Sequence, residues 1–313
     1  MSTTPPCPNW PSCKGKQRAT WCLVQGGKLG AICSVWTEEV PCVDSYRTAV
    51  LGHFFAQEPQ AGIRLLDYAC VRLREQGIDY VIGPMDGNSW HRYRLVTMAG
   101  ERSPFLLEYY TPCDWPAIFT AAGFAPLAGY SSAQTATANY QDPSAAKFVA
   151  RADKLGVTLR PFDPARAQTE LTALYALSVQ SFAHNVLYSP IDRHEFLALY
   201  TPLLPYIVPD LFLLAEHAGQ LVGFVLAVPD YLQQARGAAI DTIIIKTLAR
   251  HPARHYAGLG SYLAQAIHER AAALGYQTAI HALMHDDNAS RIISDKSAQT
   301  IRRYALYGKV LHE

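Results

Sequence analysis

The sequence predicts an α+β (mixed α/β) protein built from two consecutive blocks. Its 313 residues suffice for two domains of roughly 100–200 residues each. Apolar residues make up 50% of the chain and charged residues 17%, which is ordinary for a globular protein with a buried core. Helical and strand patterns follow one another in a similar order in both blocks. This order predicts a weak internal repeat of about 150 residues.

The first block follows an irregular, proline-rich arm at residues 1–18. Apolar spacing predicts a helix over residues 63–76 that Gly77 ends, and a short helix over 115–122. Apolar runs rich in β-branched and aromatic residues predict strands at 29–35, 46–55, 80–82, 105–110 and 125–131. The segment 132–143 is rich in small and polar residues, so we expect the block to span residues 19–143.

The second block is expected to span residues 144–313. Apolar periodicity predicts helical segments at 144–155, 165–182, 194–200, 261–273, 288–293 and 300–307. Strands are predicted at 157–161, 211–216, 221–228, 238–248 and 277–284. Gly219 lies in the turn of a β-hairpin between the second and third of these strands.

Charge and targeting signals argue against several classes of protein. The 27 basic and 26 acidic residues give a net charge of +1, so no electrostatic footprint for nucleic acid is present. No apolar run reaches the length of about 18 residues that predicts a membrane span. The N-terminus lacks a secretory leader pattern, and we expect a cytoplasmic protein. The seven cysteines include no Cys-x-x-Cys pair, which favours reduced thiols over a metal site.

The most informative segment is the loop 255–260, His-Tyr-Ala-Gly-Leu-Gly, which joins a predicted strand to a predicted helix. A helix N-terminus offers unpaired N–H groups, and glycines let the backbone approach a phosphate closely. The loop is not a P-loop, because Ser261-Tyr262 follows Gly260 in place of Lys-Ser/Thr. It is not a Rossmann fingerprint either, because residue 263 is Leu. A plain strand-to-helix turn is the alternative interpretation.

The loop resembles the Arg/Gln-x-x-Gly-x-Gly/Ala pattern of the GNAT (GCN5-related N-acetyltransferase) family. His255 takes the place of Arg/Gln, and Gly258 and Gly260 match. The hairpin around Gly219 and the pair Asp287-Asn288 follow the family order. The resemblance implies tandem GNAT-like domains, each a mixed, mostly antiparallel sheet flanked by helices. The first block would be degenerate because it lacks a Gly-x-Gly loop, as in two-domain bacterial GNAT-like proteins.

The resemblance further implies an acyl-CoA-dependent N-acyltransferase, with acetyl-CoA, another acyl-CoA or the pantetheine of an acyl carrier protein as donor. Backbone groups of Thr247, Leu248 and Ala249 would pair with the pantetheine arm, and Asn288 would contact it. The pyrophosphate would be held at the start of the helix by His255, Tyr256, Ala257, Gly258, Leu259, Gly260 and Ser261.

Direct acyl transfer needs a base for the amine and an acid for the leaving thiolate. Asp241 is a candidate base at the start of the predicted strand, or else a solvated residue at a strand end. His285 is a second candidate base, sharing strand parity with His281, and the alternative is a hydrogen-bonded structural histidine. Tyr304 or Tyr307 could protonate the thiolate, although tyrosines at this spacing are also typical of a helix core.

The expected partner is a small-molecule or peptide amine acceptor, with a homodimer as a further option and no nucleic acid or membrane. The acceptor could contact the apolar stretch 187–206 or a polar, aromatic loop of the first block. This loop contains Asp86, Asn88, Trp90, His91 and Arg92. The alternative functions are a non-catalytic CoA-binding module and a structural protein without a cofactor.

Overall fold

The computed structural model describes residues 17–287, 294 and 298–312. The first half contains two helices and six strands: β1 (Gln17–Gln25), β2 (Lys28–Trp36), β3 (Thr48–Ala56), α1 (Pro59–Arg74), β4 (Tyr80–Gly83), β5 (Leu95–Met98), α2 (Trp115–Ala121) and β6 (Ala125–Ala136). The second half contains the remaining elements: α3 (Pro143–Leu155), β7 (Val157–Pro161), α4 (Ala167–Phe182), α5 (Arg193–Tyr200), β8 (Phe212–His217), β9 (Gln220–Pro229), α6 (Tyr231–Ala235), β10 (Thr242–Arg250), α7 (Leu259–Ala273), β11 (Thr278–His285) and β12 (Gln299–Val310).

One 12-stranded sheet runs through the described part of the chain in the order β1-β2-β3-β4-β12-β6-β11-β10-β9-β8-β7, with β5 paired to β12. Two neighbouring pairs are parallel, β3 with β4 and β10 with β11, and each is joined by a crossover helix, α1 or α7. The other pairs are antiparallel. The predicted α+β class, with a mostly antiparallel sheet flanked by helices, is confirmed.

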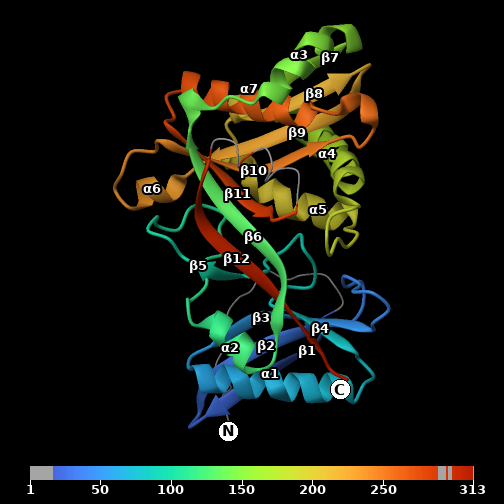
Figure 1. Ribbon diagram of the computed structural model, residues 1–313, viewed down its shortest axis with the longest axis vertical. Coiled ribbons are helices and arrows are strands. Elements are labelled where there is room, and N and C mark those ends of the chain that lie inside the picture. The colour runs from blue at the N-terminus through green and yellow to red at the C-terminus, as the bar shows by residue number, and fades with distance from the viewer. Residues whose placement is uncertain (1–16, 288–293, 295–297, 313) are drawn as a thin grey trace.

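The two halves exchange strands at the middle of this sheet. β6 follows the first half in sequence but pairs with β11 of the second half, and β12 follows the second half but pairs with β4 and β5 of the first. The two exchanged strands also pair with each other, and they run together between the two lobes of the molecule in Figure 1. The division into residues 19–143 and 144–313 stays a prediction, and both blocks depend on a strand from the other.

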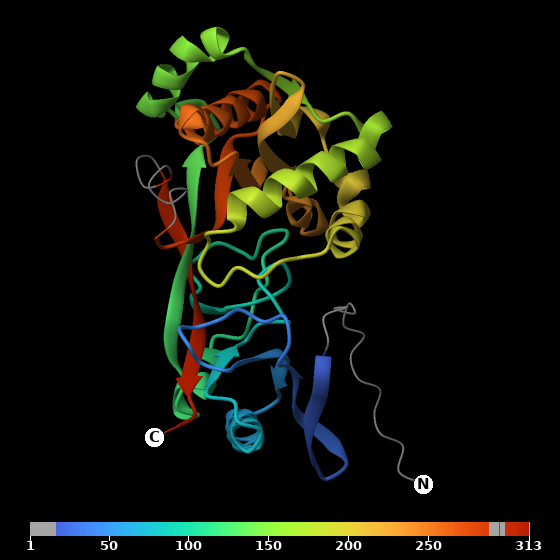
Figure 2. The same ribbon diagram turned by 90° about the vertical axis from the view of Figure 1, so that its right-hand side faces the viewer.

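Helices cover the second half of the sheet on both faces. Leu259, Leu263 and Ile267 of α7 pack with Phe148 of α3 on one face. Leu171, Leu174 and Leu177 of α4 pack with Phe196 of α5 on the other. Figure 2 shows these two helix layers on opposite sides of the strands. Among the described residues, no helix is long and apolar enough to cross a membrane.

Three local predictions were wrong. Residues 300–307 belong to β12 and not to a helix, and residues 132–136 continue β6 where we expected irregular chain. β12 is buried on both faces, so its apolar residues do not alternate and the sequence lacks a strand period. Residues 105–110 form a turn, in which Leu107 has φ +67° and the Glu108 N–H donates to the Phe105 carbonyl. The helical piece expected at 288–293 lies outside the described residues.

Candidate active site

The parallel strands β10 and β11 separate part-way along their length. They pair from Thr242 with Thr278 to Ile245 with His281. Beyond this point β10 pairs only with β9, and β11 only with β6, within the described residues. The inner edge of β10 from Lys246 onward therefore carries backbone N–H and C=O groups with no partner strand. An extended ligand can bind to such an edge as an added strand.

Irregular backbone marks both strands where they diverge. The register between β10 and β9 shifts between Ile245 and Thr247, which leaves Lys246 as the extra residue of a bulge. The register between β11 and β6 shifts between His281 and Met284, and Leu283 has φ +60°. Both irregularities face the same opening. Bulges of this kind re-aim side chains next to active sites.

The start of α7 lies over the far end of β10. Gly258 caps the helix with φ +93°, a conformation that favours glycine, and its carbonyl accepts the first helical hydrogen bond from Tyr262. The N–H groups of the first turn have no partner within a helix. Gly223, which pairs with Arg250, brings β9 close to α7, since a Cβ on Gly223 would lie 2.9 Å from Leu259 Cδ2.

Packing beneath the loop holds it in position. The buried Tyr256 shares a hydrogen bond of 2.6 Å between its hydroxyl and His217 Nδ1. The Ala257 carbonyl accepts a hydrogen bond from Arg151 of α3. Leu259 is fully buried in the core beneath α7. These contacts hold the side chains of Tyr256 and Leu259 in the core. The backbone at the start of α7 is left on the side of the gap between β10 and β11.

A cavity of about 650 Å³ lies where β10 and β11 separate, and it extends to residues of the first half of the chain. Gly260 and Ala264 of α7 line one side, and Thr247 and Leu248 of β10 line another. The remaining wall includes Trp90 and other residues from loops of the first half. A volume of this size suits a small-molecule ligand, and clefts between domains are common sites for one.

Comparison with known proteins identifies this part of the chain. Residues 172–292 match the model of the acetyltransferase (GNAT) family. Less than half of the chain therefore resembles this family in sequence. The matched segment contains β10, the loop before α7, and β11 up to the cavity. A search of curated proteins finds no match in sequence.

Solved structures show the same fold over most of the chain. A GCN5-related glucosamine N-acetyltransferase region of a fungal multi-domain GH3 beta-N-acetylglucosaminidase has a TM-score of 0.54 at 15% identity, over 90% of this chain and 32% of that one. This chain therefore spans about a third of the fungal chain. A GCN5-related N-acetyltransferase from Sphaerobacter thermophilus has a TM-score of 0.52 at 13% identity, over 92% and 78% of the two chains. A tandem GNAT protein from the clavulanic acid biosynthesis pathway has a TM-score of 0.50 at 12% identity, over 94% and 83%. The predicted tandem GNAT-like fold is confirmed.

The structure brings several of the residues expected to bind CoA to the large cavity. Thr247, Leu248 and Gly260 line it, whereas Ala249 and Ser261 are nearly buried beside it. His255 is exposed and lies outside the cavity lining, with its ring tilted by 52° against that of Tyr256 and the centroids 4.0 Å apart. Asn288 lies outside the described residues.

Asp241 lies at the wrong end of β10 for a base acting in this cavity. It precedes the strand, while the α7 loop follows it, and Asp241 is absent from the cavity lining. Its Oδ1 accepts hydrogen bonds from Gln233 Nε2 at 2.7 Å and Thr242 Oγ1 at 2.8 Å. These bonds lower the pKa of the carboxyl, so Asp241 serves to hold the start of the strand.

His285, the second candidate base, lies at the cavity. It lines the cavity at the end of β11, and its Nδ1 accepts a hydrogen bond from the Asp287 N–H at 3.1 Å. Its Nε2 is buried and has no hydrogen-bond partner among the described residues. The ring packs edge-on against Tyr130, with centroids 5.0 Å apart. Because Nδ1 accepts, the neutral ring carries its proton on Nε2 and its free electron pair on Nδ1. A histidine placed at this cavity suits proton transfer.

Tyr304 and Tyr307 do not reach the cavity lining because they lie in β12. The Tyr304 hydroxyl donates to Glu108 Oε1 at 2.5 Å and shares a 3.1 Å hydrogen bond with Ser132 Oγ. Burial raises the pKa of Tyr304. Tyr307 packs on Phe119 in the core of the first half. Both are buried in the core of the sheet, whereas the alternative interpretation of the sequence placed them in the core of a helix.

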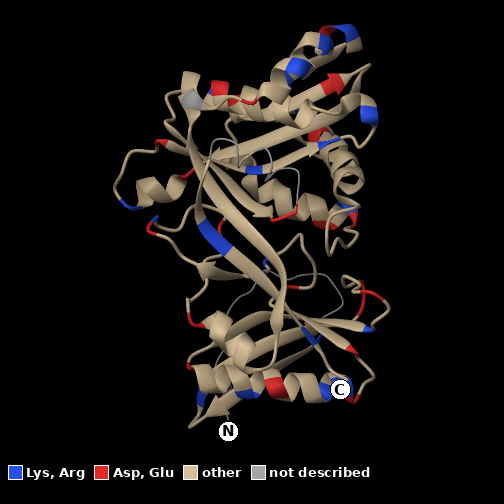
Figure 3. Cartoon of the chain, viewed as in Figure 1, with Lys and Arg blue, Asp and Glu red and all other residues tan. Residues whose placement is uncertain are grey.

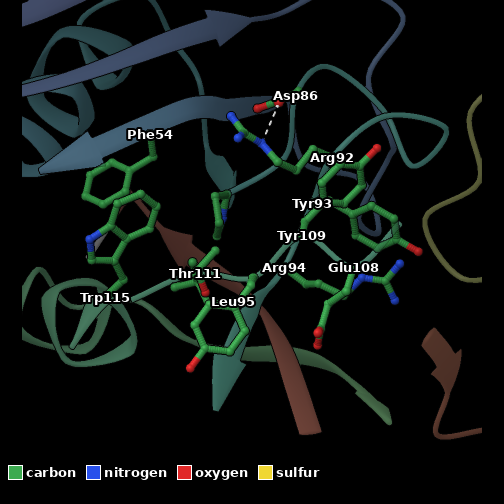
Figure 4. A pocket seen from close by; sticks show the side chains of 12 residues that line it. Phe54, Asp86, Arg92, Tyr93, Arg94, Leu95, Glu108, Tyr109, Thr111 and Trp115 are labelled. Carbon is green, nitrogen blue, oxygen red and sulfur yellow. Dashed lines mark hydrogen bonds and ion pairs between the residues drawn. The ribbon is translucent and has the colours of Figure 1, made fainter. Parts of the chain in front are cut away.

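The acceptor-side residues divide between two places. Trp90, Tyr188 and Tyr200 line the large cavity. Asp86 and Arg92 form an ion pair of 3.1 Å and line a smaller cavity of about 240 Å³ in the first half, shown in Figure 4. His91 belongs to the same predicted loop and also contacts the second half of the chain. Its Nε2 lies 2.6 Å from Glu195 Oε1.

Sequence reasoning missed Lys246 and Arg94, two cations that line the large cavity. The sequence does mark Lys246, because it is the only charged residue between Thr242 and Ala249 in an otherwise apolar strand. No local pattern marks Arg94. Its position depends on contacts with Leu283, 189 residues away along the chain.

A buried histidine pair stabilises the wall behind the cavity. His268 Nδ1 lies 2.7 Å from the Ala264 carbonyl, which can only accept, so Nδ1 carries the proton. His268 Nε2 then accepts from His281 Nε2 at 3.1 Å, and His281 Nδ1 accepts from the Ser294 hydroxyl at 2.8 Å. Both rings are neutral in this arrangement, and Tyr140 stacks on His268 at 3.8 Å.

Lowering the pH from about 7.5 to about 5.5 should destabilise the protein through this pair. Burial lowers the pKa of His268 to about 4, and burial with the nearby His268 lowers the pKa of His281 to about 3. Below about pH 6.5 the unfolded chain binds more protons than the folded one, so stability is lost as the pH falls. The loss is up to about 1.4 kcal/mol per pH unit and histidine, or roughly 3 kcal/mol for the pair at the lower pH.

Urea unfolding at both pH values measures this loss. In the double variant His268→Gln/His281→Gln, the free energy of unfolding should fall less between the two pH values, by the roughly 3 kcal/mol assigned to the pair. An equal pH dependence in the double variant and the wild type would contradict the assignment.

Proposed function

We propose that the protein is an acyl-CoA-dependent N-acyltransferase that transfers an acetyl or longer acyl group directly to an amine. The separation of β10 from β11 beside the glycine-capped start of α7 carries this proposal. A slot with unpaired backbone groups ends at a helix N-terminus, and a cavity adjoins both. This combination fits a thiol-bearing arm that ends in a diphosphate.

The donor would be held by backbone groups along its length. The inner edge of β10 from Thr247 to Ala249 would pair with the pantetheine arm. The N–H groups of Leu259, Gly260 and Ser261 would bind the pyrophosphate with the positive end of the helix dipole. Arg250 lines the same end of the cavity and adds a positive charge. Arg151, which bonds the Ala257 carbonyl, supplies a second cation beside the loop in which His255 replaces Arg/Gln.

The cavity supplies the two proton-transfer groups that the reaction needs. His285 Nδ1, which now accepts from the Asp287 N–H, would take the proton of the amine. The amine nitrogen bonds to the acyl carbon and the carbon–sulfur bond breaks in the same reaction. Tyr200 lines the cavity and has a side-chain hydrogen bond with Thr247, at the strand edge expected to hold the arm. Burial raises the pKa of Tyr200 to about 12, so its phenol keeps a proton that it can give to the departing thiolate.

Two measurements test the proposed function. CoA added far above its dissociation constant should raise the unfolding temperature, because a ligand that binds only the folded state stabilises it. Acetyl-CoA with a panel of amines should then release free thiol, detected with a chromogenic disulfide. CoA binding without thiol release from any acyl-CoA would favour a non-catalytic CoA-binding module. No thermal shift with CoA or acyl-CoA would count against both functions.

Replacing His285 with Gln should lower kcat by about 10²- to 10⁴-fold, the usual contribution of a general base. The thermal shift with CoA should be unchanged, since His285 lies at the end of β11 and not at the α7 loop. Steady-state thiol release and the thermal shift give the two readouts. His312→Gln is the control, because His312 pairs with Asp79 in the first half, far along the sheet. Equal activity in both variants would exclude His285 as the base.

A further inference from the structure

The charged side chains that line the large cavity are mostly cationic. Asp287 is the only carboxylate among the lining residues. The lining cations are Arg94, Lys246 and Arg250. His184 and His285 line the cavity as well, whereas His281 is neutral in its buried pair. Elsewhere Lys and Arg alternate with Asp and Glu over the outside of the molecule, as Figure 3 shows. The excess of positive charge is therefore a property of the cavity, and it calls for an anionic ligand.

Lys246 lies in the cavity with no partner anion among the described residues. It is the bulged residue of β10, and its Nζ lies 6.0 Å from the centre of the Tyr200 ring. Limited hydration, together with the charge of Arg94, lowers its pKa. Placing an unpaired ammonium among apolar and aromatic groups is costly unless an anion binds there.

Arg94 comes from the first half and is only 6% exposed. Its guanidinium carbon lies 3.9 Å from the centre of the Tyr93 ring and 4.4 Å from that of Tyr130. Its Nη1 donates to the Leu283 carbonyl at 3.2 Å, and its Nε has no hydrogen-bond partner among the described residues. Arg94 and Leu283 both have positive φ, +75° and +60°. The hydrogen bond thus links two residues with strained backbone, and such strain clusters at ligand sites.

Neither cation is needed for the expected diphosphate site. Arg250 is at the α7 end of β10, and Lys246 precedes it by four residues, or roughly 13 Å of strand. Glu108 does not neutralise Arg94, because its oxygens bind Tyr304, Arg302 and the Phe105 N–H. In Figure 4, Arg94 and Glu108 lie at one end of the smaller cavity, with Phe54 and Trp115 at the other. Tyr93 and Arg94 line both cavities and so separate them.

We infer that Arg94 and Lys246 bind a carboxylate of the amine acceptor, so that the substrate class is an amino acid or a compound with a similar amine and carboxylate. This inference rests on the proposed N-acyltransferase function. Arg94 approaches from the first half, and Lys246 lies at the opening between β10 and β11. A carboxylate held between them would position its amine near His285, which lines the same cavity. Arginine and lysine recognise a carboxylate through charge-assisted hydrogen bonds.

The test compares acceptors that differ only in the carboxylate. Thiol release from acetyl-CoA is measured with a panel of α-amino acids and with the corresponding α-amino amides. The wild type should prefer the acids by about 10- to 100-fold in kcat/KM, as expected for hydrogen bonds to a charged group. Lys246→Met and Arg94→Gln should each raise KM for the acids to about that of the amides. The thermal shift with CoA should stay as in the wild type, which also shows that the variants fold.

Arg92→Gln is the matched control, since Arg92 pairs with Asp86 and lines only the smaller cavity. It should keep the preference for acids. Equal use of acids and amides by the wild type, or a preference that survives in both Lys246→Met and Arg94→Gln, would overturn the inference. A preference for succinyl-CoA over acetyl-CoA that both variants lose would instead assign the carboxylate to the acyl group.

A thermal-shift series with the amino acids alone separates this inference from the proposed function. If CoA does not stabilise the wild type, the acyltransferase proposal fails. Stabilisation by amino acids but not by their amides, lost in Lys246→Met, would then still support the carboxylate site. If CoA binds and is turned over with amides only, the acyltransferase stands and the carboxylate site is wrong.

Discussion

Ending the chain after Ala298, which removes β12, should abolish cooperative unfolding in both halves of the protein. β12 lies between β4 and β6, so its loss opens the sheet of the first half and exposes an edge of β6. Its buried side chains include Ile301, Tyr304, Leu306 and Tyr307. At about 1.5–3 kcal/mol each, these four contribute roughly 6–12 kcal/mol. A whole domain is stable by only about 5–15 kcal/mol, so we expect the truncated chain to be largely unfolded.

Circular dichroism and urea titration measure this effect. A chain that ends after Leu311 is the control, because it retains β12 and the backbone hydrogen bond from Leu311 to Asp79. It should unfold cooperatively with nearly the wild-type midpoint. If the chain without β12 still unfolded in one sharp transition and bound CoA, the second half would be independent of the exchanged strand.

Replacing Gly258 with Val should remove the thermal shift with CoA and lower kcat/KM by at least about 100-fold. A β-branched residue is strained at φ +93°, and its Cβ would lie 3.4 Å from Phe148 Cβ. The backbone at Gly258 must therefore turn, which redirects the N–H groups of the first turn of α7. Loss of two or three hydrogen bonds to a charged ligand, at about 1.5–3 kcal/mol each, accounts for a factor of this size.

Gly275→Val provides a control with matched backbone strain. Gly275 follows the opposite end of α7 with φ +90°, and a Cβ there meets no atom within 4 Å. Both variants should lose a similar amount of stability, measured by urea unfolding, but only Gly258→Val should lose CoA binding. Retention of the CoA shift in Gly258→Val would show that the helix start does not hold the pyrophosphate.

Local signals made much of the architecture predictable. Gly258 marks the start of α7, because a turn with positive φ favours glycine wherever it occurs. Gly219 similarly marks the β8–β9 hairpin, and the helical period of α1 and α4 agrees with their buried faces. Such features depend on residues close in sequence, so they can be read before the chain is folded.

The sequence by itself determined much of the order of the elements, the loop before α7 and the candidate base His285. Only the tertiary structure decided that β6 and β12 exchange between the halves, which converts Tyr304 and Tyr307 from candidate acids into core residues. It also brought Arg94 to within hydrogen-bonding distance of Leu283 and beside the cavity that Lys246 lines. The physical reason is that strand pairing joins residues far apart in sequence. No local period records which strand will supply the partner.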